Sequence, residues 1–240
     1  MAIHGLDPSL GAYSVKEASL YIKATLKRSP VFPRISTHHL HWWIREGLVN
    51  GERFEYAASG EFVNFLELVS FRMIATMRAF GIKSKDIQLA HNLLKQRWGW
   101  SYPFAMEPVW VAKPDVFVHI ENVPVAVTRY WQGALDLMDD YLLPVQVGFH
   151  GLTFDPDEQA ATWTPSEGVI LDPRVQFGEP CIQGTRIPTE TIWAFNKAGD
   201  GVDALTYMYG LPLYKIDAAI AWEEKIAVCV SESEHQVSAR

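Results

Sequence analysis

The chain has 240 residues, of which 48% are hydrophobic, and carries a formal net charge of −7. This composition excludes a largely disordered protein, and the length allows a buried core in one or two domains. We expect a cytoplasmic protein with no membrane partner, because no apolar run approaches the roughly 18 residues of a membrane span and two cysteines are too few for a disulfide framework.

The charge is divided unevenly along the sequence. Residues 1–105 contain 13 Lys and Arg against 8 Asp and Glu, a net +5, whereas residues 106–240 contain 8 against 20, a net −12. A binding surface depends on local rather than total charge. The asymmetry therefore predicts a first module that approaches a polyanion, joined to a second module with another task.

The first part of the chain predicts two short helices. Ser14 and Glu17 have the spacing of a capping box and precede apolar residues at helical intervals. Residues 25–34 contain two prolines and predict a loop, after which Ser36 is expected to cap a second helix that ends near Gly47. Together the two helices indicate a helix-turn-helix.

A wing and two more helices are expected next. Residues 48–62 contain two turn signals around a short strand-like piece, which predicts a two-stranded wing. Apolar residues from Phe62 to Phe80 predict a helix with one apolar stripe, stopped by Gly81. Ser84 is expected to cap the following helix, with Gly99 just past its end.

The middle of the chain has a different composition. Residues 106–154 are rich in Val, Phe and Trp and are interrupted by prolines, which predicts short strands. A helix is expected over 132–141 and a pair of strands over 144–154. Residues 155–168 are polar and acidic, and we expect a linker or surface loop there.

The last part predicts three helices after a turn-rich segment that begins at Val169. Thr189 is expected to cap the first of them, with Ile192, Phe195 and Ala198 on its apolar side. The second and third are expected over 202–209 and after Pro212, forming a helix-turn-helix-like unit with an acidic surface.

The expected fold class is thus α+β, mainly α. Its parts are a winged helix-turn-helix over 1–105, a β-rich connecting region over 106–168, a three-helix domain over 169–230 and a flexible tail over 231–240.

The stretch STHHLHWWIREGLV raises the question of whether its histidines bind a metal or another molecule. On a helix capped by Ser36, the side chains of His38, His41 and Arg45 share one face. A zinc site requires about four ligands, and no cysteine occurs in the first 180 residues to complete one. A second alternative is that these are solvated surface histidines, or that His39 packs against the loop. DNA contact explains more, since a short capped helix beside a basic loop and a wing is typical of a recognition helix.

A DNA-binding surface is therefore predicted on the first module, with no metal. A single recognition helix reads few base pairs, so operator DNA would be bound by a homodimer. The residues expected to contact DNA are Ser14, Lys16, Lys27, Arg28, Arg34, Ser36, Thr37, His38, His41, Arg45 and Arg53.

No catalytic residue and no cofactor are expected. The sequence lacks a nucleophile elbow, a P-loop, a GxGxxG and an HExxH pattern, so it does not indicate an enzyme.

Two family resemblances follow from these segments. YSVKEASLYIKA, ISTHHLHWWIREGLV and FLELVSFRMIATMRAFGIKSKDIQLA resemble the MerR-like winged helix-turn-helix over about 90 residues, although the loop over 25–34 is longer than usual in that family. ILDPRVQFGEPCIQGTRIPTETI resembles the domain-of-unknown-function family 433 (DUF433), which usually has Val or Ile at Cys181. Its signature is carried by Asp172, Pro173, Gly178, Pro180, Gly184, Thr185, Arg186, Ile187 and Pro188.

The resemblances imply a function. DUF433 domains occur in toxin-antitoxin pairs next to PIN-like ribonucleases, and the whole order is similar to VapB-type antitoxins. They imply an antitoxin that neutralises such a toxin and regulates its own operon, with toxin contacts at Gly184, Thr185, Arg186 or Arg240. Alternatively, Gly184 and Thr185 only form a turn, and Arg186 pairs with Asp172 or Glu190.

The sequence also allows a second interpretation of the function. A stand-alone MerR-like regulator would bind a small ligand in the β-rich middle, where Trp110, Phe117, Tyr130 and Trp131 lie.

Overall fold

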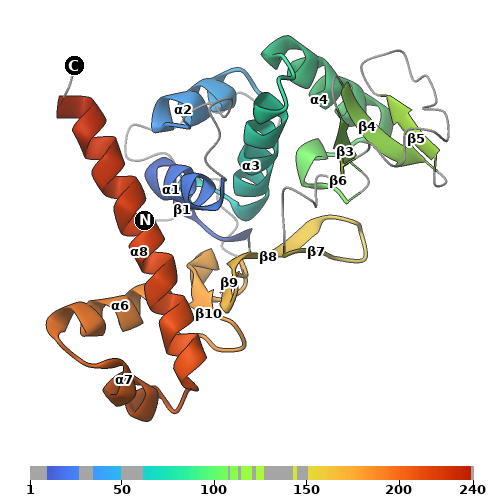
Figure 1. Ribbon diagram of the computed structural model, residues 1–240. Helices are drawn as coiled ribbons and strands as arrows, with labels where there is room; N and C mark the ends of the chain where they lie inside the picture. Colours follow the sequence, from blue (N-terminus) through green and yellow to red (C-terminus); the bar gives the residue numbers. More distant parts are fainter. Residues whose placement is uncertain are drawn as a thin grey trace, which may run out of the picture.

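The computed structural model of the protein combines helices with antiparallel sheets and is mostly helical (Figure 1). It describes residues 10–26, 35–49, 62–107, 109–112, 115–120, 123–126, 143–144 and 151–238. In chain order the elements are β1 (Tyr13–Ser14), α1 (Val15–Thr25), α2 (Thr37–Arg45), β2 (Phe62–Val63), α3 (Phe65–Ala79), α4 (Ser84–Trp98), β3 (Val109–Ala112), β4 (Asp115–Ile120), β5 (Val123–Ala126), β6 (Leu143–Pro144), β7 (Leu152–Phe154), β8 (Ala160–Ser166), β9 (Val169–Leu171), β10 (Cys181–Ile182), α6 (Thr189–Ala198), α7 (Val202–Tyr209) and α8 (Leu213–Ser238). None of the helices in these ranges is both long and apolar enough to cross a membrane.

The capping box at the start of α1 is confirmed. The Ser14 hydroxyl accepts a hydrogen bond from the Glu17 backbone N–H at 3.2 Å, and the Ser14 N–H donates to the Glu17 carboxylate at 2.7 Å. The reciprocal bonds satisfy donors that would otherwise be unpaired at the helix start.

Helix α2 also begins and ends where the sequence predicts. Ser36 occupies the N-cap position, but its hydroxyl lies 2.8 Å from Nδ1 of His39 and does not cap the backbone. Gly47 has a φ of +67°, and the N–H of Leu48 donates to the carbonyl of Trp43, which closes the helix end.

The predicted wing lies mostly outside the described residues, which omit 50–61. Phe62 and Val63 form β2, which pairs with β1 in antiparallel fashion, Tyr13 opposite Val63. The helix expected from Phe62 therefore begins later, at Phe65. The helix begins with a capping box that the sequence analysis did not predict. In it the Asn64 side chain accepts a hydrogen bond from the Glu67 N–H at 2.9 Å.

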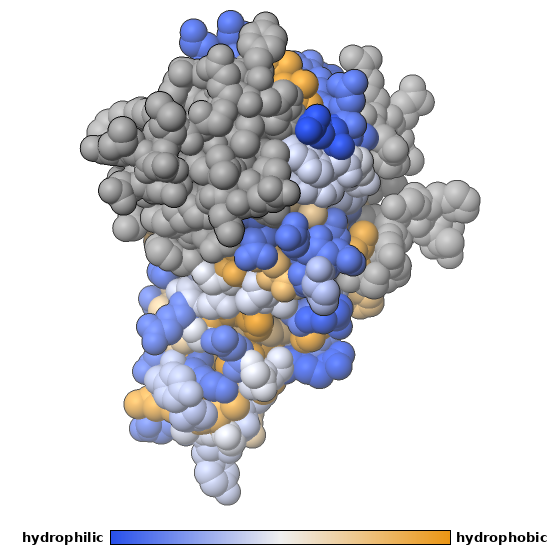
Figure 2. All heavy atoms as spheres, turned by 90° about the vertical axis from the view of Figure 1, so that its right-hand side faces the viewer, coloured by the Kyte–Doolittle hydropathy of each residue, from blue (hydrophilic) through white to orange (hydrophobic). Residues whose placement is uncertain are grey.

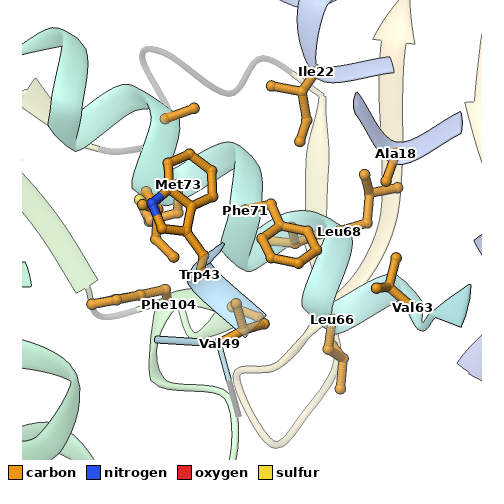
Figure 3. Packing of buried hydrophobic residues seen from close by; sticks show 14 of the residues in the cluster. Ala18, Ile22, Trp43, Val49, Val63, Leu66, Leu68, Phe71, Met73 and Phe104 are labelled. Atoms are coloured by element: carbon orange, nitrogen blue, oxygen red, sulfur yellow. The ribbon is translucent and has the colours of Figure 1, made fainter. Parts of the chain in front are cut away.

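Helix α3 is the centre of the N-terminal part of the chain up to residue 105, which we call the head. The expectation of a single apolar stripe is wrong, since 14 of its 15 residues are buried, so neighbours cover the helix on all sides. Figure 3 shows Phe71 of α3 beside Trp43 of α2, and their ring centroids lie 6.1 Å apart. The buried guanidinium of Arg72 donates to the Thr25 hydroxyl at 3.2 Å, which ties α3 to α1.

The start of α4 also differs from expectation. Lys83, not Ser84, occupies its N-cap position and makes no side-chain capping bond. Gly99 ends the helix with a φ of +72°, as predicted.

The middle of the chain contains two four-stranded antiparallel sheets, in the orders β5-β4-β3-β6 and β10-β9-β8-β7. The short strands predicted there are confirmed. The pair expected over 144–154 is not, because β6 and β7 belong to different sheets. The helix predicted over 132–141 lies outside the described residues.

The linker or surface loop predicted over 155–168 is wrong for residues 160–166, whereas residues 155–158 and 167–168 lie in turns between strands. Residues 160–166 form strand β8, which pairs with both β7 and β9. Only 2% of the surface of Trp163 is exposed, and Ala160 is also buried. The hydroxyl groups of Thr153 on β7 and Thr162 on β8 form a hydrogen bond across the strands, with 2.7 Å between their oxygens. A polar sequence is therefore compatible with a central strand.

Three helices complete the chain, and the predicted span of the second, 202–209, is confirmed. Thr189 is the first residue of α6, and Pro188 occupies the N-cap position expected for Thr189. The flexible tail predicted over 231–240 is wrong as far as Ser238, because α8 continues to that residue. Lys23 of α1 holds this end, since its ammonium donates to the hydroxyl of Ser233 at 2.8 Å.

One hydrophobic core joins the two ends of the chain. Figure 1 shows α8 running past β9 and β10 to α1. Trp222 of α8 is fully buried, and its ring lies 5.9 Å from that of Tyr21 of α1. The same cluster includes Leu171 of β9 and Leu68 of α3. Helix α8 therefore shares a core with the head, whereas Ile192 of α6 and Leu205 of α7 belong to a second cluster.

Candidate nucleic-acid interface and C-terminal motif

The outer face of α2 has the predicted composition. His38, His41 and Arg45 are exposed, whereas Leu40 and Trp43 on the opposite face are buried in the core. The Nε of Arg45 lies 3.9 Å from a carboxylate oxygen of Glu46, a distance at which an exposed pair contributes little. The helix thus presents imidazole and guanidinium groups to solvent.

His39 has a different role from its neighbours. His39 is half-buried, and its Nδ1 forms a hydrogen bond with the hydroxyl of Ser36. The centroid of its ring lies 6.3 Å from that of Trp43. Burial, and then the positive charges of His38 and Arg78, lower the pKa of His39, so it stays neutral at pH 7. His39 therefore packs against Ser36 and Trp43 of its own segment, whereas most of the loop against which it was expected to pack, residues 27–34, lies outside the described residues.

The structure describes only some of the other predicted DNA contacts. Lys16 is exposed on α1, the hydroxyl of Ser14 is engaged in the helix cap, and Thr37 is half-buried. The remaining four residues, Lys27, Arg28, Arg34 and Arg53, lie outside the described residues. Within the described ranges, no group of three His, Cys, Asp or Glu side chains is arranged to hold a metal ion.

Gly184 and Thr185 form a turn. Gly184 has a φ of +79°, a conformation that favours glycine. The Thr185 hydroxyl donates to the carbonyl of Ile182 at 2.9 Å and accepts from the N–H of Ile187 at 3.1 Å. Lys215 of α8 donates to the adjacent carbonyl of Gln183 at 2.9 Å. These contacts give both residues a structural role within the motif.

Arg186 differs from its neighbours in the motif. Its side chain is exposed and makes no ion pair with any described residue. The expected partner Asp172 instead accepts two bonds from the Arg174 guanidinium, at 2.8 and 2.9 Å, and this pairing lowers the pKa of Asp172. Arg240, the other predicted cation, lies outside the described residues.

Carboxylates gather where α6 meets α8. The Thr189 hydroxyl donates to Oε1 of Glu223 at 2.5 Å. Burial raises the pKa of Glu223; the bond from Thr189 opposes this shift, and the charge of Glu190 adds to it. Burial also raises the pKa of Glu179, and the negative charges of Glu190 and Glu17 raise it further. Burial and then Glu179 raise the pKa of the Cys181 thiol to about 11, so it remains protonated at neutral pH.

Glu223→Gln is expected to raise the melting temperature at pH 7. The amide keeps an acceptor for Thr189 and removes a charge that opposes folding. Because the folded-state pKa lies above the ordinary value of 4.5, the ionised group destabilises the protein above that pKa. The gain should shrink as the pH falls toward 4, which thermal unfolding at both pH values would measure. Glu224→Gln, at an exposed neighbour, is the control. An equal gain at both pH values would contradict the explanation.

Sequence reading also missed an exposed apolar surface near the start of α8. Tyr207, Met208, Leu213 and Tyr214 are all exposed. On α6, Phe195 and Ala198 are exposed as well, although both were expected to pack with Ile192. Apolar spacing alone does not distinguish such a surface from a core face.

The predicted small-ligand site lies in the β-rich middle of the chain. The side chains of Trp110, Phe117, Tyr130 and Trp131 lie outside the part of the chain whose side chains are described.

Comparison with known proteins supports the motif and the fold. Residues 169–222 match the family model described as "Protein of unknown function (DUF433)". None of the curated proteins matches the chain. A similar solved structure is the X-ray crystal structure of Rv2018 from Mycobacterium tuberculosis, with a TM-score of 0.61 and 15% sequence identity over 90% of this chain and 98% of that one. At this identity the likeness concerns the fold, and the chain contains a DUF433 domain at residues 169–222.

Proposed function

We propose that this chain is the antitoxin of a type II toxin-antitoxin pair. In this proposal it neutralises a PIN-like ribonuclease and binds the operator of its own operon as a homodimer. The observation that carries the DNA-binding part is the face of α2, where His38, His41 and Arg45 are exposed on a helix whose other face is fixed in the core. The antitoxin part is supported by the DUF433 domain at residues 169–222 together with the resemblance to VapB-type antitoxins.

Charge supports a division of labour between the two ends of the chain. The net +5 of residues 1–105 favours DNA, whereas the net −12 of residues 106–240 favours a partner with a basic surface. A ribonuclease must present positive charge to RNA. An acidic protein can therefore associate with that surface rapidly and compete with RNA for it.

The proposal is tested by expressing the tagged chain with the protein encoded by the neighbouring reading frame. A stable complex in which the cleavage of RNA is suppressed is expected. If the chain elutes alone and leaves RNA cleavage unchanged, the antitoxin function is wrong.

DNA binding is tested separately with a labelled fragment from upstream of the gene. Arg45→Ala is expected to weaken binding about tenfold, because it removes an exposed cation from the proposed contact face. Lys225→Ala removes one positive charge from the exposed surface of α8 and serves as the matched control. Equal losses for the two variants would contradict a specific role for α2.

Binding to this fragment is also expected to weaken several-fold in the His38→Ala/His41→Ala variant, because both exposed imidazoles can donate hydrogen bonds on the proposed interface. Fluorescence anisotropy at constant ionic strength would measure the effect. A variant that binds as tightly as the wild-type chain would remove both histidines from the list of phosphate contacts.

A further inference from the structure

The exposed apolar side chains of this protein are concentrated at one end. Of the eight large hydrophobic residues that are exposed in the described part of the chain, five lie between residues 195 and 214. We define the α7–α8 corner as Tyr207, Met208, Leu213 and Tyr214. Tyr207 is 91% exposed and Tyr214 is 65% exposed. Isolated surface apolar residues need no explanation, but a cluster of aromatic and methionine side chains is typical of a protein interface.

The neighbouring helix α6 carries a further exposed apolar side chain, Phe195. The ring of Phe195 on α6 lies 6.4 Å from that of Tyr209 on α7. At the lower end of the molecule, where α7 lies, Figure 2 shows orange and pale side chains beside blue ones. Apolar and charged groups therefore alternate on the visible face of this end of the molecule.

Carboxylates border the corner on both helices. Asp203 precedes Tyr207 by four residues on α7, and Asp217 follows Leu213 by four residues on α8, so each pair shares one helix face. Both aspartates are exposed. The ammonium of Lys215 on α8 donates to the carbonyl of Gln183 at 2.9 Å, outside the corner. We call Asp203 and Asp217 the acidic rim of the corner.

We infer that the α7–α8 corner is the docking site for a basic protein surface that contributes apolar side chains, and that this surface belongs to the ribonuclease of the proposed function. A second copy of the chain fits less well, because its corner carries the same two exposed aspartates and not the basic surface that would complement them. Nucleic acid is disfavoured by the same carboxylates. The inference rests on the proposed function and adds the location and chemistry of the contact.

The test measures the affinity of the full chain for the protein encoded by the neighbouring reading frame. Tyr207→Ser/Tyr214→Ser should weaken binding at least about tenfold, the scale of an interface hot spot. The matched control is Leu89→Ser/Val228→Ser, at exposed apolar positions outside the corner, and should change the affinity by no more than about twofold. All four side chains are exposed, so circular dichroism should confirm that both variants are folded.

A second variant tests the acidic rim. Asp203→Lys/Asp217→Lys should slow association and reduce the dependence of the affinity on salt. Unchanged association would overturn the charge part of the inference.

The remaining outcomes separate the inference from the proposed function. If wild-type chain binds its neighbour and suppresses RNA cleavage but Tyr207→Ser/Tyr214→Ser does so equally well, the docking site is wrong and the antitoxin function stands. If the wild-type chain does not bind the neighbouring protein, both the docking site and the antitoxin function are wrong. If light scattering shows that the tyrosine variant converts an oligomer of the chain into a monomer, the corner joins two copies and the inference is overturned.

Discussion

Trp222→Ala is expected to lower the free energy of unfolding by about 3–5 kcal/mol, the range measured for truncation of large aromatic residues in protein cores. Trp222 is completely buried on α8. Its ring contacts Tyr21 of α1, and its cluster extends to β9 and α3. The alanine would leave a cavity at the point where the C-terminal helices meet the head.

The location of Trp222 predicts more than a loss of stability. Because Trp222 lies in the core that α8 shares with the head, α1 and α8 should lose protection from hydrogen exchange together. Trp193→Ala is the control, since Trp193 is only half-buried on α6 and lies outside the shared cluster; it should cost at most about 1 kcal/mol. If Trp222→Ala unfolds the C-terminal helices and leaves the head intact, the shared core does not couple them.

Local rules predicted the element boundaries well where a cap or a glycine decides them. The capping box of Ser14 and Glu17 and the glycines after α2, α3 and α4 act within one turn of the chain, so the sequence contains all the information they need. Ser84 and Thr189 show the limit of this reasoning. Both residue types can cap a helix, but α4 begins without a side-chain cap. The hydroxyl of Thr189 donates a hydrogen bond to Glu223, 34 residues away.

Tertiary contacts explain the larger errors. The polar composition of residues 155–168 predicted a linker, yet β8 lies between two strands whose hydrogen bonds do not depend on side-chain polarity. The apolar pattern from Phe62 to Phe80 predicted one buried face, whereas α3 is buried on all sides and contacts α1, α4 and the turn over Pro103–Ala105. The acidic C-terminal segment seemed without structure because its partner, Lys23 of α1, is 210 residues away.

The candidate site divides in the same way. Helical periodicity was sufficient to place His38, His41 and Arg45 on one exposed face of α2. It was not sufficient at the α7–α8 corner, because a tyrosine that packs and a tyrosine that faces solvent have the same sequence spacing. The turn formed by Gly184 and Thr185 depends on hydrogen bonds to Ile182 and Ile187, which a motif match alone does not distinguish from partner contacts.

Gly178→Ala is expected to destabilise the protein by about 3 kcal/mol or more, because two costs add. Gly178 has a φ of +90°, which L-residues rarely adopt. An added Cβ would also overlap the hydroxyl oxygen of Tyr13 and lie 2.7 Å from its Cζ. Gly210→Ala separates the two costs, since Gly210 has a φ of +62° but no atom within 4 Å of its Cβ position; this variant should lose only about 1 kcal/mol.

The contact between Gly178 and Tyr13 links the C-terminal motif to the start of α1. The N–H of Ala12 donates to the carbonyl of Phe177 at 2.9 Å, so backbone and side chain join the same two segments. The buried Tyr13 hydroxyl has no hydrogen-bond partner among the described residues, and Tyr13→Phe should therefore be neutral or stabilise the protein by up to about 1 kcal/mol. The phenylalanine would not rescue Gly178→Ala, because the ring carbon remains 2.7 Å from the new methyl group. Chemical denaturation of the single and double variants would test this, and full rescue by Tyr13→Phe would show that only the hydroxyl requires glycine at position 178.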